Sequence, residues 1–307
     1  MRLNIQDETS MLKTVILGRA DTIGNKPKLN QTYDPSSLLN LKKGTYPLKS
    51  DLVKELNTYK ITLKKNRIKV LDLDKILNCN QIYARDIGFV IQGFFFISNI
   101  IPQRGREING LNSILSEIDN SKIIKLPEEV HIEGGDVILD NDNIFLGYYN
   151  EPDYKKQKTA RTNINGVKYL ENFFGKEKIK SFELNKSMVN PKKNALHLDC
   201  CFQPVGKKLA VICKDGFKKL NDYELLIDYY GIENILNLNS SEMSLMMCNF
   251  FSISPEKVIT DVRFKKLNYW LNSKNIKTIE INLSQTSKQG GLFRCTTLPL
   301  FRKNDIN

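Results

Sequence analysis

One layout occurs three times along the chain and restricts its fold more than any other feature. Residues 86–99 (DIGFVIQGFFFISN), 136–148 (DVILDNDNIFLGY) and 199–212 (DCCFQPVGKKLAVI) each hold two apolar runs separated by a turn. This arrangement is typical of a β-hairpin. The sequence therefore predicts three hairpins, each of which begins with an aspartate.

Segments with the apolar spacing of a helix lie around these hairpins, at 50–66, 107–118, 167–175, 221–231 and 263–275. Strand pairs thus alternate with helices at intervals of roughly 50 to 60 residues, which indicates a repeated α/β module. If the modules close around an axis, Asp86, Asp136 and Asp199 converge on one pocket. The alternative is that each aspartate only marks a strand start, where turn chemistry favours it.

Length and charge restrict the function less strongly. The 307 residues, 41% of them hydrophobic, are enough for one large domain or two small ones. The net charge is +12, but the lysines form short groups such as 64–69 and 155–158 without interleaved aromatic residues. This pattern favours a solvated lysine-rich surface over a nucleic-acid-binding face.

The termini and cysteines favour a reduced, cytoplasmic setting. The first ten residues, MRLNIQDETS, lack an apolar signal region, and no stretch of about 18 apolar residues predicts a membrane span. None of the six cysteines forms a C-x-x-C pair, which disfavours a zinc ribbon. In a strand, Cys200 and Cys201 would point to opposite faces and would not bond to each other.

Polar motifs precede the hairpins and recur near the C-terminus: YARDIG (83–88), HIEGGD (131–136), NALHLD (194–199) and QGGLFRCTTLPL (289–300). On one strand, His197 and Asp199 would share a face. Two glycines before Cys295 would let the backbone approach a ligand closely. Taken alone, a cysteine is more often structural and a histidine more often a hydrogen-bonded core residue.

In this order, R-D, E-G-G-D, R-T-N, H-L-D and G-G-x-x-x-C-x-T resemble the guanidino-group-modifying enzymes of the pentein fold. These include arginine deiminases, dimethylarginine dimethylaminohydrolases and amidinotransferases. The resemblance extends from residue 12 to residue 300. It implies a single catalytic domain over 1–307, built as an α/β propeller of five ββαβ modules around a central active site.

The resemblance also implies roles for individual residues. Cys295 matches the nucleophile, His197 the general acid/base, and Glu133 the acid that partners the histidine. Asp86 and Asp199 match the two carboxylates that hold the guanidinium.

Two further residues are assigned more loosely. Arg161, in ARTN (160–163), matches an arginine that can hold a substrate α-carboxylate. For Asp136, two roles stay open: it either shapes the turn or lines the pocket. Lys288 and Gln289 stand where some deiminases carry an arginine, and Arg294 is the candidate to replace it.

The chemistry of a guanidinium supports these roles. Two carboxylates clamp its planar, permanently charged group through paired hydrogen bonds. Its central carbon is a poor electrophile, which calls for a thiolate. The thiol in turn needs a nearby cation, either charged His197 or the guanidinium itself. His197 would protonate the departing nitrogen and then deprotonate water or an acceptor amine. No metal or cofactor is required.

The sequence thus predicts a hydrolase acting on arginine or a derivative. An amidinotransferase and a non-catalytic pentein that binds RNA or the ribosome are the alternatives. Residues 19–50 are rich in turn formers and predict a long ordered loop, either a lid over the pocket or a plain surface excursion. The particular substrate and a homo-oligomeric state stay open.

Overall fold

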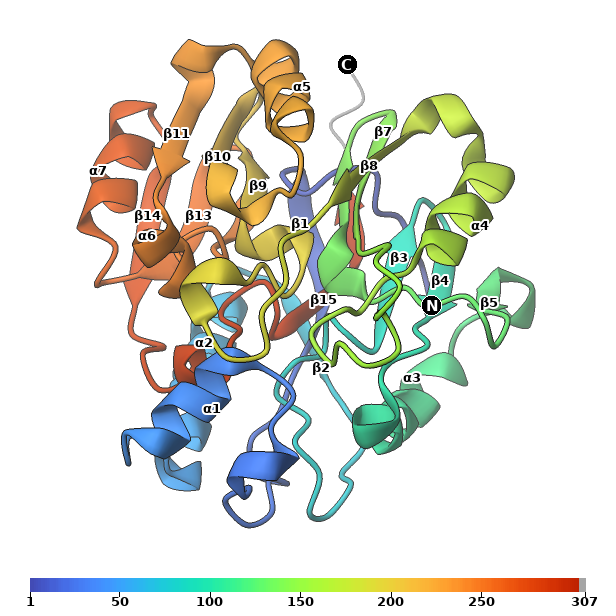
Figure 1. The fold of residues 1–307 in the computed structure, drawn as a ribbon, viewed down its shortest axis with the longest axis vertical. Coiled ribbons are helices and arrows are strands. Elements are labelled where there is room, and N and C mark those ends of the chain that lie inside the picture. The colour runs from blue at the N-terminus through green and yellow to red at the C-terminus, as the bar shows by residue number, and fades with distance from the viewer. Residues whose placement is uncertain (304–307) are drawn as a thin grey trace.

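Residues 1–303 are described by a computed structural model, and they form five three-stranded sheets (Figure 1). Within each sheet, one strand pair is antiparallel and the other is parallel. By sheet, the strands are β15 (Thr297–Lys303), β1 (Met11–Leu17) and β2 (Lys69–Asp72); β3 (Gly88–Ile91), β4 (Phe94–Ile97) and β5 (Ile123–Lys125); β6 (Val137–Asp140), β7 (Asn143–Tyr148) and β8 (Ile179–Glu183); β9 (Phe202–Val205), β10 (Leu209–Cys213) and β11 (Ile235–Leu238); β12 (Phe251–Ser254), β13 (Lys257–Asp261) and β14 (Lys277–Ile281).

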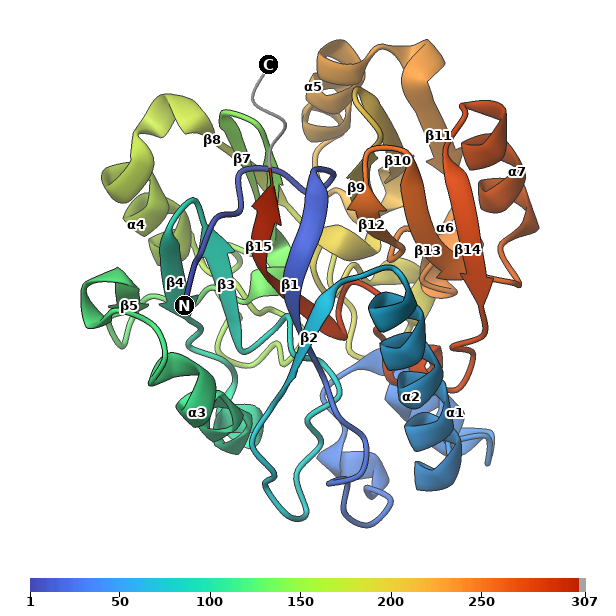
Figure 2. The ribbon, with the colours of Figure 1, turned by 180° about the vertical axis from the view of Figure 1, so that it is seen from behind.

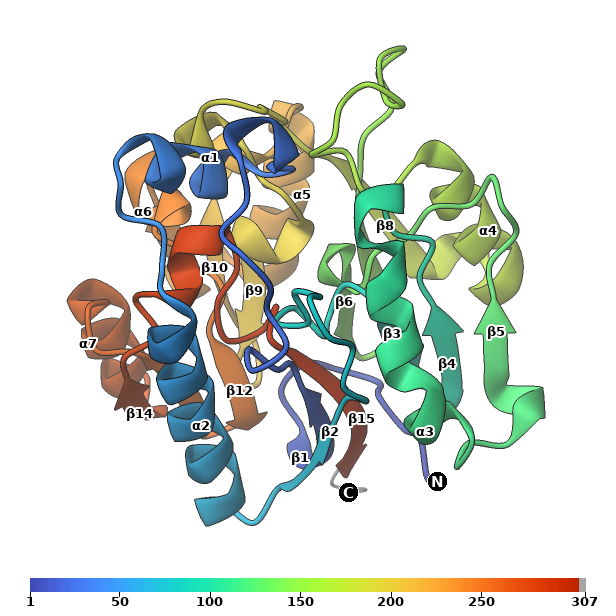
Figure 3. The same ribbon diagram turned by 90° about the horizontal axis from the view of Figure 1, so that it is seen from below.

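Helices connect the parallel strands, as a parallel pair requires a crossover. The α-helices are α1 (Pro35–Lys42), α2 (Lys49–Lys65), α3 (Asn112–Leu115), α4 (Ile164–Phe174), α5 (Leu220–Tyr230), α6 (Ser240–Ser244) and α7 (Lys265–Ser273). The sheets surround the middle of the molecule and the helices lie outside them (Figures 1 and 3). The predicted fold class, a five-module α/β propeller, is confirmed.

The first and last strands of the chain close the ring. Strand β1 pairs antiparallel with β15, from Met11 opposite Lys303 to Leu17 opposite Thr297. Figure 2 shows the two strands side by side. This pairing places the segment before β15, which carries Cys295, at the centre of the molecule.

Local sequence explains the individual elements. Strands β3 and β6 are buried along their whole length because helices and neighbouring sheets cover both faces. Helix α4 begins after Asn163, whose side chain accepts a hydrogen bond from the backbone N–H of Gly166. It ends at Gly175, where φ is +98°.

Several predicted elements are confirmed and others need correction. The three hairpins are β3–β4, β6–β7 and β9–β10, and four of the five helical segments correspond to α2, α4, α5 and α7. The segment 107–118 instead holds the second half of a 3₁₀ helix over Pro102–Leu111, followed by one turn of α3. The 3₁₀ helix contains Gly105 and Gly110, and glycine disfavours a regular α-helix.

The segment 19–50 is not one continuous loop. Asp34 caps α1 by accepting a hydrogen bond from Ser37, and Pro35 stands at the first helical position. The turn formers at its centre therefore start a helix. In the chain from residue 1 to 303, none of the helices has the length and apolar character to cross a membrane.

Candidate functional site

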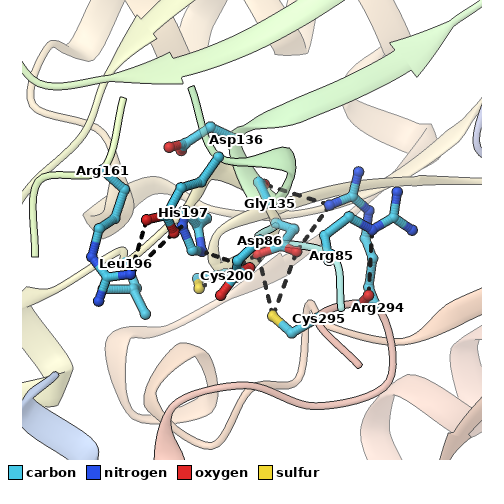
Figure 4. Close-up of polar contacts among 12 residues, drawn as sticks. Arg85, Asp86, Gly135, Asp136, Arg161, Leu196, His197, Cys200, Arg294 and Cys295 are labelled. Carbon is cyan, nitrogen blue, oxygen red and sulfur yellow. Dashed lines mark hydrogen bonds and ion pairs between the residues drawn. The ribbon is translucent and has the colours of Figure 1, made fainter. Parts of the chain in front are cut away.

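The candidate site lies where the segments before four strands meet at the centre of the sheets (Figure 4). Asp86 precedes β3, Glu133 precedes β6, His197 and Asp199 precede β9, and Cys295 precedes β15. All five side chains are buried. The structure thus brings together residues that are up to 209 positions apart in the sequence.

The predicted strand at the H-L-D motif is wrong. Leu198–Cys200 form one 3₁₀ turn, and β9 begins only at Phe202. Both adjacent cysteines therefore precede the strand, and His197 and Asp199 do not share a strand face. The three hairpin aspartates likewise stand in turns before their strands. These turns let a carboxylate point to the centre instead of packing against the sheet.

His197 is held by Glu133 and by a glycine. Its Nε2 lies 2.8 Å from the Glu133 Oε2. A Cβ atom on Gly135 would lie 2.6 Å from the ring Cγ, so only glycine lets the imidazole occupy this place. The other ring nitrogen, Nδ1, is buried without a hydrogen-bond partner among residues 1–303 and lies 3.8 Å from Asp86 Oδ1.

The charges around this pair favour an imidazolium. Burial alone would lower the pKa of His197, but the Asp86 carboxylate and the hydrogen bond to Glu133 raise it. Burial would raise the pKa of Glu133, but Arg161 and His197 hold it well below its usual range. Both shifts favour a charged imidazolium on His197, with the Glu133 carboxylate as its counter-ion.

Cys295 faces Asp199. Its Sγ lies 3.8 Å and 3.6 Å from the two carboxylate oxygens. Burial raises the pKa of the Cys295 thiol well above its usual range, and Asp199 raises it further. The resting cysteine is thus a neutral thiol beside an anionic group, in the absence of a cationic ligand.

Alkylation should report this raised pKa directly. Because only the thiolate reacts, the rate at which iodoacetamide modifies Cys295 in the ligand-free protein is expected to stay low at pH 7 to 8 and to rise only at higher pH, beyond the ordinary value of about 8.5. Peptide mass spectrometry across a pH series checks this. A midpoint near or below neutral pH would contradict it.

Arg294 is committed to two buried acids. Its guanidinium donates to Glu8 at 2.8 Å and to Asp199 at 2.9 Å, and it also donates to the backbone carbonyl oxygens of Gly135 and Val137. The idea that Arg294 replaces a carboxylate-binding arginine is therefore wrong. Its Nε, Nη1 and Nη2 atoms all donate to groups of the protein, so no donor is left for a substrate carboxylate. Arg294 instead fixes Asp199 beside the sulfur.

Arg161 and a second arginine, Arg104, lie on the other side of the site. Arg161 Nη1 donates to Glu133 at 3.0 Å and Nη2 donates to the carbonyl oxygen of Tyr33 at 3.1 Å. Arg104 bonds to Asp86 at 2.6 Å and, through two nitrogens, to Glu107. Both guanidinium groups lie near the ring of Tyr33.

Asp136 has both carboxylate oxygens occupied. One accepts from the backbone N–H of Leu198 at 2.9 Å, and the other accepts from the hydroxyl of Thr162 at 2.7 Å. Asp136 thus ties the turn after His197 to the module that carries Glu133. Just before His197 in the sequence, the carbonyl oxygens of Ala195 and Leu196 accept hydrogen bonds from Lys186.

Three of the site residues have the donor atoms of a metal site. One ligand atom each from Asp86, Glu133 and His197 lies within 4.8 Å of the others. Arginine guanidinium groups already pair with both carboxylates, so a cation would have to displace Arg104 and Arg161. This arrangement suits a metal ion poorly.

A cavity of about 320 Å³ adjoins the site. Tyr33 and Asp34, from the segment 19–50, contribute to its lining together with Tyr83. Tyr83 also reaches the loop 290–295, which carries Cys295, because a Cβ on Gly291 would lie 2.4 Å from its ring and 2.9 Å from Cys295 Cβ. The segment 19–50 therefore covers a cavity whose wall contacts the residues around the thiol.

Several residues of the site carried no clear signal in the sequence. Glu8, Arg104, Glu107 and Asn249 are buried around it, but none belongs to a quoted motif. Arg104 stands 18 residues after Asp86 in a connection without periodicity. The single hint in the sequence is the spacing of Arg104 and Glu107, opposite charges three residues apart.

Comparison with known proteins agrees with the predicted fold and the predicted family. A family profile described as "N,N dimethylarginine dimethylhydrolase, eukaryotic" matches residues 38–302. "Uncharacterized protein YkgA" from Bacillus subtilis is 28% identical over 225 residues, which are 72% of this chain and 70% of that protein. "Uncharacterized protein ZK1307.1" from Caenorhabditis elegans is 22% identical over 251 residues, which are 80% and 81% of the two chains.

Solved structures share the architecture. The N-terminal domain of ArgZ, an arginine dihydrolase from the ornithine-ammonia cycle in Cyanobacteria, superposes with a TM-score of 0.77 at 16% identity, over 94% of this chain and 98% of that one. SxtG, an amidinotransferase from Microseira wollei in the saxitoxin biosynthetic pathway, gives 0.76 at 16% identity, over 99% and 98%. At this identity the likeness shows the fold alone.

Proposed function

We propose a hydrolytic function for this chain, which belongs to the N,N-dimethylarginine dimethylhydrolase family of guanidino-modifying pentein enzymes. The substrate is a small guanidino compound, arginine or a derivative. The reaction breaks a C–N bond of the guanidino group through an amidino intermediate bound to Cys295. Six free, buried cysteines fit a reducing cytoplasm.

One observation carries the proposal: a buried thiol near two carboxylates that each keep one oxygen out of contact with the arginine that holds the other. Arg104 pairs with Oδ2 of Asp86, and Oδ1 is buried without a partner among residues 1–303. Arg294 pairs with Oδ2 of Asp199, whereas Oδ1 accepts weak hydrogen bonds from the thiols of Cys200, at 3.7 Å, and Cys295, at 3.8 Å. A flat cation with N–H groups on two edges satisfies both oxygens and supplies the charge that a thiolate needs.

The first half of the reaction follows from this placement. As the guanidinium enters, the Cys295 thiol loses its proton to solvent, and the thiolate adds to the central carbon. Charged His197 gives its proton from Nδ1 to the departing nitrogen, the C–N bond breaks, and ammonia or an amine leaves. Glu133 holds the imidazole through Nε2.

The second half regenerates the enzyme. Neutral His197 takes a proton from water, and the hydroxide adds to the amidino carbon. The C–S bond then breaks with return of the electron pair to Cys295, the hydroxyl proton of the adduct passes to the thiolate, and a ureido product leaves. An acceptor amine in place of water would give amidino transfer, which is the alternative function.

The substrate tail would extend toward the cavity under the segment 19–50. Tyr33 lines this cavity, and its carbonyl oxygen accepts from Arg161. Arg161 would exchange this bond for a substrate α-carboxylate, and the segment would act as a lid. Asp136 would support the pocket through the His197 turn and would not touch the substrate.

A substrate panel tests the function. Arginine, methylated arginines, agmatine and free guanidino acids are incubated with the protein and scored for ammonia, amine and ureido products. Turnover without an acceptor amine is expected. An absolute requirement for an acceptor would establish the transferase instead. Steeply salt-dependent RNA affinity without any guanidino turnover would favour the non-catalytic alternative.

A further inference from the structure

Asn249 is a buried side chain that contacts the sulfur of Cys295. It lies between α6 and β12 with 0% of its surface exposed. Its Nδ2 is 3.2 Å from Cys295 Sγ. Its Oδ1 accepts from the backbone N–H groups of Leu292, at 3.2 Å, and of Cys295, at 3.1 Å.

The orientation of this amide is fixed by its neighbours. A backbone N–H can only donate, so the atom that faces Leu292 and Cys295 must be the oxygen. The NH₂ group consequently points to the sulfur and to the carbonyl oxygen of Asp199, at 3.4 Å. An exchange of the two amide atoms would place two donors against two donors.

Asp199 and Asn249 both contact the sulfur, but they favour different protonation states of it. A thiol can donate to the Asp199 carboxylate, whereas a thiolate is repelled by it. The hydrogen bond from Asn249 strengthens when the sulfur becomes charged, since charge-assisted hydrogen bonds are stronger than neutral ones. Asn249 donates to this sulfur from its side chain, and a backbone hydrogen bond from Leu292 also lowers the pKa of the thiol.

We propose that Asn249 is a catalytic residue that stabilises the thiolate of Cys295 by donating a hydrogen bond from its side-chain amide. Through its Oδ1, the same side chain also holds the backbone of residues 292–295 in place. The inference rests on the proposed function only in that Cys295 is the reacting atom. It assigns to the loop before β12 a part in the chemistry of the neighbouring module.

The test is the pH dependence of Cys295 alkylation by iodoacetamide in the unaltered protein and in Asn249→Ala. The variant is expected to move the midpoint to higher pH and to slow alkylation at a fixed pH below it by about tenfold. Asn268→Ala is the matched control. Asn268 is also a buried asparagine, but it bonds to the Asp261 carbonyl oxygen, and its loss should leave the midpoint unchanged.

A purely structural role would lower the melting temperature of Asn249→Ala and leave the midpoint where it is, and that result overturns the proposal. If this variant does not fold, Asn249→Asp replaces it, because its carboxylate still accepts both backbone N–H groups but cannot donate. In the unaltered protein, the side-chain amide NMR signal of Asn249 should also titrate together with the thiol. A signal that does not move would overturn the proposal equally. None of these readouts needs a substrate, so the substrate panel can fail independently.

Discussion

Replacing Cys295 by serine is expected to lower turnover of a guanidino substrate by at least about 10⁴-fold and to leave substrate binding in place. Serine keeps the size of the side chain, but its hydroxyl does not ionise near neutral pH and is a far weaker nucleophile. The carboxylates of Asp86 and Asp199 are unchanged, so the guanidinium still finds its clamp. Steady-state kinetics and calorimetric titration with substrate measure the two effects separately.

Cys213→Ser is the matched control for this variant. Cys213 is also a buried, free cysteine, but it lies at the end of β10 and outside the site. It should retain most of the turnover. Near-wild-type activity of Cys295→Ser, with Cys213→Ser equally active, would remove the thiol from the mechanism.

Arg294→Leu is expected to lower the free energy of unfolding by about 3–5 kcal/mol. The change leaves the buried carboxylates of Glu8 and Asp199 without their common partner. Turnover should fall as well, because Asp199 loses the contact that fixes it beside Cys295. Urea denaturation measures the stability change. For comparison, Lys60→Met breaks the partly exposed pair with Asp72 and should cost no more than about 1 kcal/mol.

The same network predicts a pH dependence of stability. Burial opposes ionisation of Glu8, but Arg294 and Arg85 lower its pKa from 4.5 to about 2. A carboxylate with a lowered pKa stabilises the fold above its unfolded pKa, and this contribution is lost as the pH falls from about 4.5 toward 2. Arg294→Leu should flatten this part of the curve. An unaltered slope would show that Arg294 does not set the charge state of Glu8.

The sequence predicted the repeated module because three hairpins are local. Their turns and apolar runs lie within 14 residues each, so spacing alone identifies them. The sheet of β15 and β1 left no such pattern, because its two antiparallel strands come from opposite ends of the chain. The pair β12–β13 is short, and its turn of Pro255 and Glu256 gives a weaker signal than the glycine turns.

The candidate site shows the same division. The motifs pointed to Glu133, His197 and Cys295 because a glycine or an aspartate follows or precedes each of them within four residues. The contacts of Arg294 with Glu8, and of Asn249 with Cys295, join residues 286 and 46 positions apart. Periodicity cannot reveal such pairs, since only the closure of the ring brings them together.

During turnover, Cys295 should carry the amidino carbon of a guanidino substrate with its remaining substituents. This expectation is tested most directly by acid-quenching the protein during turnover of an active substrate and analysing the Cys295 peptide by mass spectrometry. We expect an added mass on Cys295 equal to that of the substrate minus the departed ammonia or amine, absent without substrate and absent in Cys295→Ser. Full turnover with an unmodified Cys295 peptide, or an adduct on another residue, would contradict it.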